Sequence, residues 1–576
     1  MKILFENEIY GHNLLEEYGL DSYAYVDKKG LSKLPYVGYF YSAKIKDCIF
    51  ILPKVFLKLD DRKKSEQKIV FGKSFTDNGK YVYANSVISL DGKDNILKRN
   101  NLDKMVYELS TWIYRAINKY WTRHPESDII KRQSNQIVES INGKKDNTLL
   151  DLVLSLEKFH KDHSKLFTYI TIVNSTGNNK IHWGKTISKV NPIIQDGVPY
   201  YLEFKNKNKI FNYDEELIVL FYSVLQYLRS ENMTSIRPEV NYELIRPSKI
   251  QSMIENGRGT KLLRSIRRKY FKDELVQLWK LMFAFFSKAE NIHSGKCSNE
   301  ALLTSSFDRV FEDMVDVLVS HDFFADLKKN RDNKRIDHIY KGKSLVGDDD
   351  IFYIGDSKYY SDGSKIDDTS IYKQFTYAKN IIQENIDLLH KKTEIPGIRY
   401  RDETTDGYNL SPNFFIRGNF SLDKLKEKGK AYYDEMGLEE HEQKFDKNIH
   451  FKNRPFDRDT LLLQAYNINF LFVLASYLNN AKNDEIKKRL HKRFRADLIN
   501  KYKQEYHFFK VKVKIDKKEF VRKHFYEYKG QMYGLENSNI IIFGFELSEN
   551  TTHLKLMEGL LAKFKGEADV EEYELM

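Results

Sequence analysis

Two aspartates and a lysine in the second half of the chain have the spacing of a hydrolytic metal site. Asp356 and Lys358 follow the apolar run 351–354, which predicts a buried β-strand that ends at the charged residues. Because side chains alternate between the two faces of a strand, both should point to the same side. Asp337 lies in a second strand-like stretch, 335–340, and pairing of the two stretches would bring its carboxylate alongside.

Two carboxylates and one ammonium group at the edge of a sheet suit metal-assisted hydrolysis of a phosphodiester. Carboxylate oxygens are hard ligands for Mg²⁺, which stabilises charge on the attacked phosphate and lowers the pKa of a bound water. A neighbouring lysine orients that water, deprotonates it or neutralises the transition state. We therefore expect Asp337 and Asp356 to hold Mg²⁺, with Lys358 acting on the attacking water.

The polar connection between the two stretches predicts a hairpin loop. Residues 341–350 contain two glycines and three consecutive aspartates. Acids in such loops are normally solvated, yet one of them would take the place of Asp356 if the strand register differed by two residues. An isolated Asp-x-Lys tripeptide is itself most often a solvated surface pair, so the surrounding elements must support the catalytic interpretation.

Helices are predicted on both sides of the hairpin. Over 306–320, apolar residues recur at helical spacing, and Glu312 lies in this stretch. A further helix around 372–378 carries Gln374 and Tyr377. This order of helix, hairpin and helix gives the charged residues a defined scaffold, which a surface tripeptide would lack.

The arrangement resembles the Asp…(Asp/Glu)-x-Lys site of the PD-(D/E)XK nucleases. The resemblance implies that Glu312 is a further acidic metal ligand and that the Ser357 carbonyl is an additional one. It also implies that Gln374 and Tyr377 support the site by facing the phosphate or Lys358. In-line attack would then leave 5′-phosphate and 3′-hydroxyl ends, the usual outcome in this superfamily.

Longer blocks of sequence narrow the resemblance to the LlaJI family of restriction endonucleases. In preserved order over roughly residues 30–510, the matching blocks are 181–187, 192–194, 199–200, 356–360, 368–374, 454–461 and 467–474. LlaJI-like nuclease subunits resemble McrC, the partner of the GTP-driven McrB ring. The resemblance implies an Mg²⁺-dependent endonuclease of a restriction system for anti-phage defence, which cuts double-stranded DNA together with an McrB-like AAA+ GTPase.

Apart from the family resemblance, the sequence itself indicates a separate NTPase partner, because no Gly-x-x-x-x-Gly-Lys-(Ser/Thr) motif occurs anywhere in the chain. Without that phosphate-binding loop, nucleotide-driven translocation must come from another polypeptide. By resemblance, the N-terminal half should dock on this partner, and self-association is an option for cutting both DNA strands. The alternative function is a non-catalytic assembly and DNA-binding subunit that stimulates the partner NTPase, although both carboxylates and the lysine are retained.

The length of 576 residues exceeds what a single hydrophobic core supports. We expect an α/β (α+β) protein with a β-rich domain over 1–100, a mixed helical and β region over 101–255 that docks the partner, and a nuclease domain over 256–576 with a basic C-terminal part. Patterning predicts strands at 36–40, 46–53 and 169–173 and helices at 101–121, 148–160, 214–232 and 256–291.

Composition indicates a cytoplasmic protein with a polyanionic partner. The net charge is +12, and the sequence pI is about 9.0. Cys48 and Cys297 are the only cysteines, which excludes a disulfide framework and a multi-cysteine zinc site. No apolar run has the length of a membrane span, and acids interrupt the N-terminus too early for a secretory signal.

Positive charge gathers in two regions that are candidates for contact with DNA phosphates. Over 509–515, lysines alternate with apolar residues, as in a strand with one lysine face: Lys510, Lys512 and Lys514. That face either contacts DNA phosphates or is the ordinary solvated face of a half-buried strand, with an edge strand guarded by lysines as an option, and the sequence favours neither. In the helix predicted from 256, Arg264 and Arg268 share a face that would meet DNA or water.

Arg458 is a third candidate for contact with DNA. It lies between Asp457 and Asp459, ahead of a long apolar stretch that predicts a helix. The two acids would cap that helix at its positive end and pair with the arginine, which leaves the DNA role open.

Overall fold

The computed structural model divides the chain into two compact units. Unit 1 comprises Met1–Leu52, Tyr83–Tyr114 and Asp128–Ser305, and unit 2 comprises Pro53–Val82, Arg115–Ser127 and Ser306–Met576. The residues that the structure describes are 2–26, 32–59, 68–70, 73–74, 76–77, 80–81, 88–89, 102–133, 148–163, 170–175, 180–210, 216–231, 233–234, 236–238, 240, 243–294, 299–321, 327–328, 336–360, 366–390, 397–420, 436–440, 453–479, 483–548 and 552–575. Arg335, Tyr169 and Cys297 lie outside them.

The chain passes from unit 1 to unit 2 for the last time between residues 305 and 306, whereas the sequence predicts a domain boundary near residue 256. Helices α7 (Pro247–Glu255) and α8 (Arg258–Ile266) lie on either side of that expected boundary. Both contribute buried residues to one hydrophobic cluster of unit 1. The glycine-rich sequence between them therefore links two packed helices instead of two domains.

The predicted helix over 256–291 is wrong, because the structure breaks it. After α8 come the short helix η3 (Arg267–Lys269) and then helix α9 (Asp273–His293). The indole Nε1 of Trp279 donates to the Leu263 carbonyl at 2.6 Å. In one continuous helix these residues would be about 24 Å apart along the axis, so α9 must fold back on α8.

Unit 1 contains a six-stranded sheet in the order β12-β1-β6-β5-β18-β13. Its strands are β12 (Ile88–Ser89), β1 (Lys2–Phe5), β6 (Asp47–Leu52), β5 (Val37–Ser42), β18 (Glu300–Thr304) and β13 (Ile130–Gln133). Strands β5 and β6 confirm two of the sequence predictions. Helix α1 (His12–Tyr18) buries Leu15 and Tyr18 against one face of the sheet.

Five helices of unit 1 share one hydrophobic cluster. Besides α7, α8 and α9, they are α4 (Leu149–Asp162) and α6 (Glu216–Ser230), both of which the sequence predicts. Thr148 starts α4 with a capping box, in which its side chain accepts from the backbone of Asp151 and the Asp151 carboxylate accepts in return.

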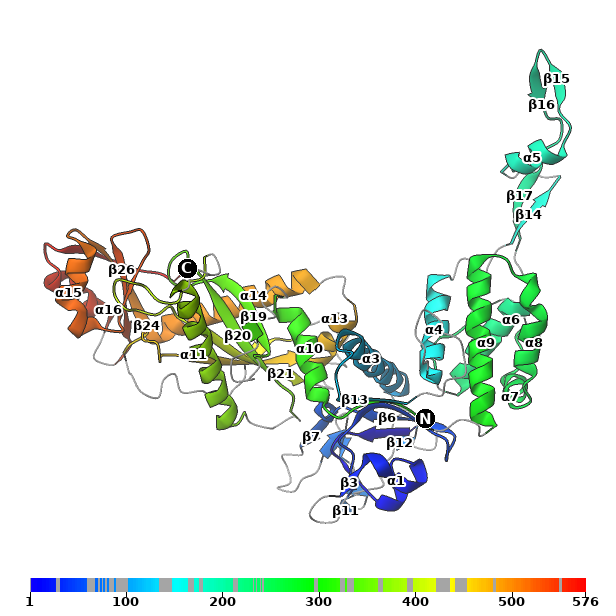
Figure 1. Ribbon diagram of the computed structural model, residues 1–576, viewed down its shortest axis with the longest axis horizontal. Coiled ribbons are helices and arrows are strands. Elements are labelled where there is room, and N and C mark those ends of the chain that lie inside the picture. The colour runs from blue at the N-terminus through cyan, green and yellow to red at the C-terminus, as the bar shows by residue number, and fades with distance from the viewer. Residues whose placement is uncertain are drawn as a thin grey trace. The chain divides into compact units, whose positions relative to one another are not determined.

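A small module of unit 1 carries many exposed apolar side chains. It consists of β14 (Ile170–Asn174), α5 (Trp183–Lys189), β15 (Ile193–Gln195), β16 (Val198–Tyr200) and β17 (Asn206–Ile210), with the β15–β16 hairpin beyond α5 (Figure 1). Asp196 and Gly197 form the hairpin turn with positive φ angles of 52° and 79°, as a two-residue Asp-Gly turn requires.

Unit 2 is built on a five-stranded sheet in the order β19-β20-β21-β23-β22. Its strands are β19 (His338–Lys343), β20 (Asp350–Lys358), β21 (Pro412–Asn419), β23 (Leu462–Asn469) and β22 (Glu439–Glu440). The two outer pairs are antiparallel, and β20, β21 and β23 run parallel to one another. This mixed sheet confirms the predicted α/β (α+β) class.

Helices pack on both faces of the unit 2 sheet (Figure 1). Helix α11 (Asp368–His390) covers the face that includes Phe415. On the opposite face lie α10 (Phe307–Val319) and α14 (Asn483–Glu505), and Phe494 of α14 stacks on Phe414 with ring centroids 4.6 Å apart. The predicted helix over 306–320 is confirmed as α10, and its apolar stripe is buried.

The apolar stretch after Asp459 is a strand followed by a short helix, so the predicted long helix there is wrong. Residues Leu462–Asn469 form β23 inside the sheet, and α13 (Phe470–Leu478) begins after the Asn469 cap. A short apolar run fits a buried parallel strand as well as a helix, and here the pairing with β21 decides. The acids before it therefore cap no helix.

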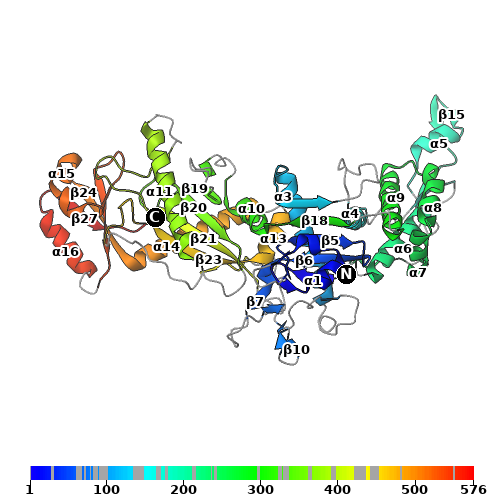
Figure 2. The same ribbon diagram turned by 60° about the horizontal axis from the view of Figure 1, so that its bottom comes forward.

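The C-terminal part of unit 2 is a βαββαβ element. In chain order it comprises β24 (Tyr506–Val513), α15 (Lys517–Tyr528), β25 (Met532–Gly534), β26 (Ile540–Glu546), α16 (His553–Lys563) and β27 (Ala568–Glu572). The antiparallel sheet has the order β25-β26-β24-β27, the arrangement of a split βαβ motif. Helices α15 and α16 lie on one side of it (Figure 2), and the opposite side packs on α14 through Phe508 and Ile542.

No helix in the described part of the chain is long and apolar enough to cross a membrane. Helix α3 (Leu102–Arg123) confirms the predicted helix over 101–121 and contributes residues to both units.

Candidate active site

The β19–β20 hairpin brings the predicted acidic residues together. The strands are antiparallel with His338 opposite Gly355, and Asp337 directly precedes β19. The backbone N–H of Ser357 donates to Asp337 Oδ2 at 2.9 Å, which holds the Asp337 carboxylate at the end of β20. The prediction that Asp337 lies beside the Asp-Ser-Lys segment agrees with this geometry.

Asp356 and Lys358 point to the same face of the sheet, as strand alternation predicts. Lys358 Nζ lies 2.5 Å from Asp356 Oδ2, and both side chains are about 15% exposed. The ammonium group also lies 5.3 Å from the centre of the Phe415 ring. Burial lowers the pKa of Lys358, but the Asp356 carboxylate outweighs burial and raises that pKa above its usual range. Lys358 is therefore a firmly held cation at neutral pH.

Asp337 carries the least compensated charge of the site. Burial raises its pKa well above the usual range, and the neighbouring carboxylates of Asp356 and Glu312 raise it further. The Ser357 N–H and Lys358 act in the opposite direction but do not offset these effects. The negative charges of Asp356 and Glu312 thus make ionisation of Asp337 unfavourable.

These residues fit a magnesium ion through charge more than through a preformed ligand cage. In the part of the chain that the structure describes, no three His, Cys, Asp or Glu side chains are arranged to hold a metal. Mg²⁺ keeps several water ligands and commonly takes only one or two carboxylates from a protein. Asp337 and Asp356 satisfy that smaller requirement, and a divalent cation would relieve the repulsion that raises the Asp337 pKa.

Helix α11 places both of its predicted residues at the site. Gln374 is 1% exposed, and its Nε2 donates to the Ile354 carbonyl of β20 at 3.2 Å. Among the described residues, its buried Oε1 has no hydrogen-bond partner. Burial raises the pKa of Tyr377, and the carboxylates of Asp356 and Asp337 raise it further. Gln374 thus ties α11 to the strand, and the Tyr377 side chain lies within the electrostatic influence of the acids.

The loop acids are not at the site. Asp350 begins β20, eight strand residues before Lys358, and forms ion pairs with Lys341 and Lys343 at 3.0 Å each. Burial raises the pKa of Asp349, which accepts a hydrogen bond from Tyr533. The alternative register, in which a loop acid replaces Asp356, is therefore excluded.

The three lysines of β24 have acidic neighbours that the sequence analysis did not anticipate. Lys512 forms an ion pair with Glu571 at 2.9 Å, and Lys514 forms one with Asp569 at 2.5 Å, both across to β27. Lys510 is partly buried opposite Glu571 in the strand register. This surface carries far less net charge than the lysines alone indicate, which favours the interpretation as an ordinary solvated face. The expected edge strand is wrong, because β24 pairs with β26 on one side and with β27 on the other.

The arginine candidates lie in different settings. Arg264 and Arg268 belong to unit 1, but Arg268 lies in η3 beyond the end of α8, so the two do not share one helix. Arg458 belongs to unit 2 in a turn whose neighbour Asp459 pairs with Lys379 of α11 at 2.5 Å. Among the described residues, the buried Nε of Arg458 has no hydrogen-bond partner. Within unit 2, the ion pair of Asp459 with Lys379 links the turn that carries Arg458 to α11.

Sequence reasoning missed Arg417. It is the register partner of Lys358 on the adjacent parallel strand β21 and is 6% exposed. A positive residue inside an otherwise apolar strand was the available signal, since buried arginines normally have a specific partner. Two adjacent strands thus each place a cation at the same level of the sheet.

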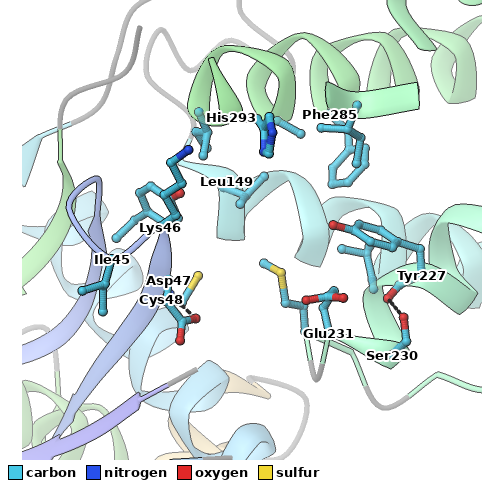
Figure 3. A pocket seen from close by; sticks show the side chains of 16 residues that line it. Ile45, Lys46, Asp47, Cys48, Leu149, Tyr227, Ser230, Glu231, Phe285 and His293 are labelled. Atoms are coloured by element: carbon cyan, nitrogen blue, oxygen red, sulfur yellow. Dashed lines mark hydrogen bonds between the residues drawn. The ribbon is translucent and has the colours of Figure 1, made fainter. Parts of the chain in front are cut away.

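Unit 1 contains a separate cavity of about 580 Å³ (Figure 3). Lys46, Asp47 and Cys48 line one side, opposite Tyr227 and Glu231. Burial, together with the neighbouring Asp47 carboxylate, raises the pKa of the Cys48 thiol to about 12, so this thiol is a poor nucleophile. The cavity does not rival the hairpin site as a catalytic centre.

Comparison with known proteins identifies the family of the chain. The sequence profile described as LlaJI restriction endonuclease matches residues 36–383, more than half of the chain. The chain belongs to the LlaJI restriction endonuclease family. The match includes Glu312, Asp337, Asp356 and both predicted residues of α11. Membership makes this LlaJI-family chain a nuclease of a restriction system.

One solved structure similar to this LlaJI-family chain is a half-complex from the tetradecameric assembly of Thermococcus gammatolerans McrB AAA+ hexamers with bound McrC. The identity is 11% and the TM-score 0.27, over 86% of this chain and 99% of that one. A likeness this distant carries no argument about fold or function. No curated protein matches the sequence.

Proposed function

We propose that this LlaJI-family chain is an Mg²⁺-dependent endonuclease that hydrolyses DNA phosphodiester bonds at the end of the β19–β20 hairpin. The supporting observation is the convergence of Asp337, Asp356 and Lys358 on one sheet edge, where none of the described residues forms an ion pair with the Asp337 carboxylate. Asp337 and Asp356 hold the metal, and the Glu312 carboxylate adds negative charge close to Asp337. Mg²⁺ supplies Lewis-acid stabilisation of the phosphate and a more acidic water.

The protein groups have distinct tasks in this proposal. Lys358 is protonated and held by Asp356, so it orients the attacking water or neutralises the phosphate and does not remove a proton. Tyr377, whose pKa the nearby carboxylates raise, donates to a phosphate oxygen in this proposal. Gln374 fixes the distance between α11 and β20 through the Ile354 carbonyl. The Ser357 carbonyl as a further metal ligand stays a prediction.

Cleavage of plasmid DNA by two matched variants tests the proposal. Asp356→Asn should reduce the cleavage rate at least about 100-fold, because it removes a metal ligand and the partner of Lys358. Asp350→Asn changes the same residue type at the other end of β20, and cleavage should stay near the wild-type rate. Equal rates for wild type and Asp356→Asn would disprove the assignment.

We further propose that a GTP-hydrolysing AAA+ protein is the partner and that unit 1 docks on it. The family resemblance and the absence of a P-loop motif from the sequence support a separate NTPase. The module around α5 supplies a surface for it, with seven exposed large apolar side chains: Trp183, Ile187, Ile193, Ile194, Val198, Tyr200 and Leu202. A patch of this kind marks a protein interface on a folded chain.

The same purified chain, assayed together with its partner, distinguishes the nuclease from the alternative, a non-catalytic subunit. With the partner, GTP and Mg²⁺ present, nicked or linear plasmid supports the nuclease. Faster GTP hydrolysis by the partner without any DNA cleavage would support the alternative. Self-association for double-strand cleavage would appear as linear product without a nicked intermediate.

A further inference from the structure

A buried hydrogen-bonded triad lies on the face of the sheet opposite Asp356 and Lys358. Ser357 points away from both of its charged neighbours and is 6% exposed. His338 is fully buried, with Nε2 2.5 Å from Ser357 Oγ and Nδ1 3.2 Å from Asp316 Oδ1. A serine, a histidine and an aspartate are therefore connected in that order, and the proposed hydrolysis uses none of their side chains.

The direction of each hydrogen bond follows from the chemistry of the groups. Although burial raises the pKa of Asp316, hydrogen bonds from His338 and Lys328 hold it well below its usual range, so the carboxylate accepts. Nδ1 therefore carries the hydrogen that Asp316 accepts, and Nε2 shares a hydrogen bond with the Ser357 hydroxyl. The orientation of Ser357 is thus fixed from a charged anchor.

Asp316, which lies in helix α10, is itself held by several hydrogen bonds. The Asp316 carboxylate accepts hydrogen bonds from Lys328 Nζ and Ser320 Oγ as well as from His338. Ser320 Oγ in turn accepts from the backbone N–H of Ile339 at 3.1 Å, which ties the end of α10 to β19. Helix α10 also carries Glu312, one turn before Asp316.

Ser357 is held at two points by consecutive residues of the neighbouring strand. Its hydroxyl bonds to His338, and its backbone N–H donates to Asp337 Oδ2 at 2.9 Å. Ser357 is also the residue between Asp356 and Lys358. A shift of Ser357 would therefore move both charged side chains and break the hydrogen bond that holds Asp337.

We propose that Asp316, His338 and Ser357 form a positioning triad, which locks the Asp-Ser-Lys segment against Asp337 so that the metal-binding carboxylates keep their relative placement. Ser-His-Asp groups act as nucleophiles where the hydroxyl reaches a substrate, and burial of Ser357 and His338 rules out that use here. None of the three touches DNA. Outer hydrogen-bond partners of this kind commonly change metal affinity or activity 10- to 100-fold.

Two serine substitutions in the same hairpin test the triad in the full chain with its partner. Ser357→Ala should lower kcat for plasmid cleavage about 10- to 100-fold with KM for DNA unchanged, and weaken Mn²⁺ binding measured by calorimetry to a similar extent. Ser344→Ala is the matched control, because Ser344 is fully buried at the loop end of the hairpin and bonds to Asn409 at 2.6 Å. It should lower unfolding stability while kcat and Mn²⁺ affinity stay unchanged.

Conservative replacements separate positioning from packing. Ser357→Thr keeps the hydroxyl and should recover most of the metal affinity, whereas Ser357→Cys keeps the volume with a weaker hydrogen bond and should not. Asp316→Asn should reproduce the loss seen in Ser357→Ala. If Ser357→Ala lowers stability like Ser344→Ala but leaves kcat and Mn²⁺ affinity at wild-type values, the triad is structural only.

The inference rests on the proposed nuclease function, and Asp356→Asn in the same series separates the two. If Asp356→Asn cuts DNA normally, the nuclease site itself is misassigned. If Asp356→Asn is inactive while Ser357→Ala has wild-type kcat and metal affinity, only the triad is refuted.

Discussion

A single methyl group at Gly355 should disturb the candidate active site from inside the sheet. Gly355 precedes Asp356 in β20, and a Cβ built on it would lie 2.1 Å from Cε2 and 2.4 Å from Cζ of Phe414. Ordinary contacts of a Cβ atom fall at 3.4–4 Å, so one of the two residues must move by more than 1 Å. The glycine is therefore needed for close packing and not for backbone freedom.

Phe414 has little room to give way. Its ring is 1% exposed and stacks on Phe494 of α14 at 4.6 Å, with Tyr340 at 6.2 Å. Overpacking of a filled core commonly costs about 1–3 kcal/mol. We expect Gly355→Ala to lower the free energy of unfolding by that amount. The variant should also reduce plasmid cleavage, because the backbone of β20 would shift next to Asp356.

A double-mutant cycle measures this clash directly. Phe414→Leu removes the ring atoms that a methyl group would meet, at a cost of about 1–2 kcal/mol for lost burial. Gly355→Ala with Phe414→Leu should then be at least about 1 kcal/mol more stable than the sum of the single effects predicts. Urea unfolding followed by circular dichroism provides the free energies.

Gly559 offers a matched control for the change itself. It lies in helix α16 with no atom within 4 Å of a built Cβ, so Gly559→Ala should be neutral or stabilising by up to about 1 kcal/mol. Wild-type stability of Gly355→Ala, or additive effects in the cycle, would refute the packing argument.

Three further predictions concern the partner surface, the pH response and DNA contact. The double variant Ile194→Asp with Leu202→Asp should abolish co-purification with the partner NTPase without lowering the melting temperature. The control Val26→Asp changes a side chain that is 62% exposed elsewhere in unit 1, and it should not affect binding. Retained binding of the double variant would exclude the module as the docking surface. Burial lowers the pKa of His491 to about 4 despite its hydrogen bond to the Val319 carbonyl, and His321 and Lys487 lower it too. The unfolded state then binds more protons between pH 4 and 6.5, so this contribution to stability is complete above about pH 6.5 and is lost toward pH 4, at most about 3 kcal/mol. His491→Gln should flatten that part of the stability curve, and an unchanged slope would contradict the assignment. Because Lys512 and Lys514 are paired with acids, their double replacement by glutamine should change the slope of log affinity for DNA against log salt by less than one; a change near two would mean that DNA displaces the acids.

The site residues were predictable from the sequence because they depend on local pattern. Strand alternation alone places Asp356 and Lys358 on one face, and the hairpin brings Asp337 to them. The stripe of apolar residues in α10 likewise determines which face of the helix is buried, and so the direction in which Glu312 projects. Each of these inferences needs only neighbours within one hairpin or one helix.

The errors arose where distant residues decide the outcome. The stretch after Asp459 became a strand because β21 offers a parallel partner about fifty positions earlier in the chain. The positive charges of the β24 lysines are offset by ion pairs with Asp569 and Glu571 of β27, a strand that follows two helices later in the chain. The fold-back of α9 on α8 buries residues of both helices in one cluster shared with α4, α6 and α7, and the Trp279 indole then bonds to the Leu263 carbonyl. Neither periodicity nor local charge contains this information.

The charge pairing of unit 2 gives the strongest physical reason to place a cation at Asp337. The aspartates around it have partners: Asp316 pairs with Lys328, Asp350 with two lysines, and Asp356 with Lys358. Among the described residues, none forms an ion pair with Asp337, whose carboxylate has one backbone hydrogen bond and two acidic neighbours. A buried carboxylate without a counter-charge costs stability, so a protein that served only as a scaffold would gain from an uncharged residue there. The cost is balanced once a divalent cation binds, which is the condition that hydrolysis of a phosphodiester at this site requires.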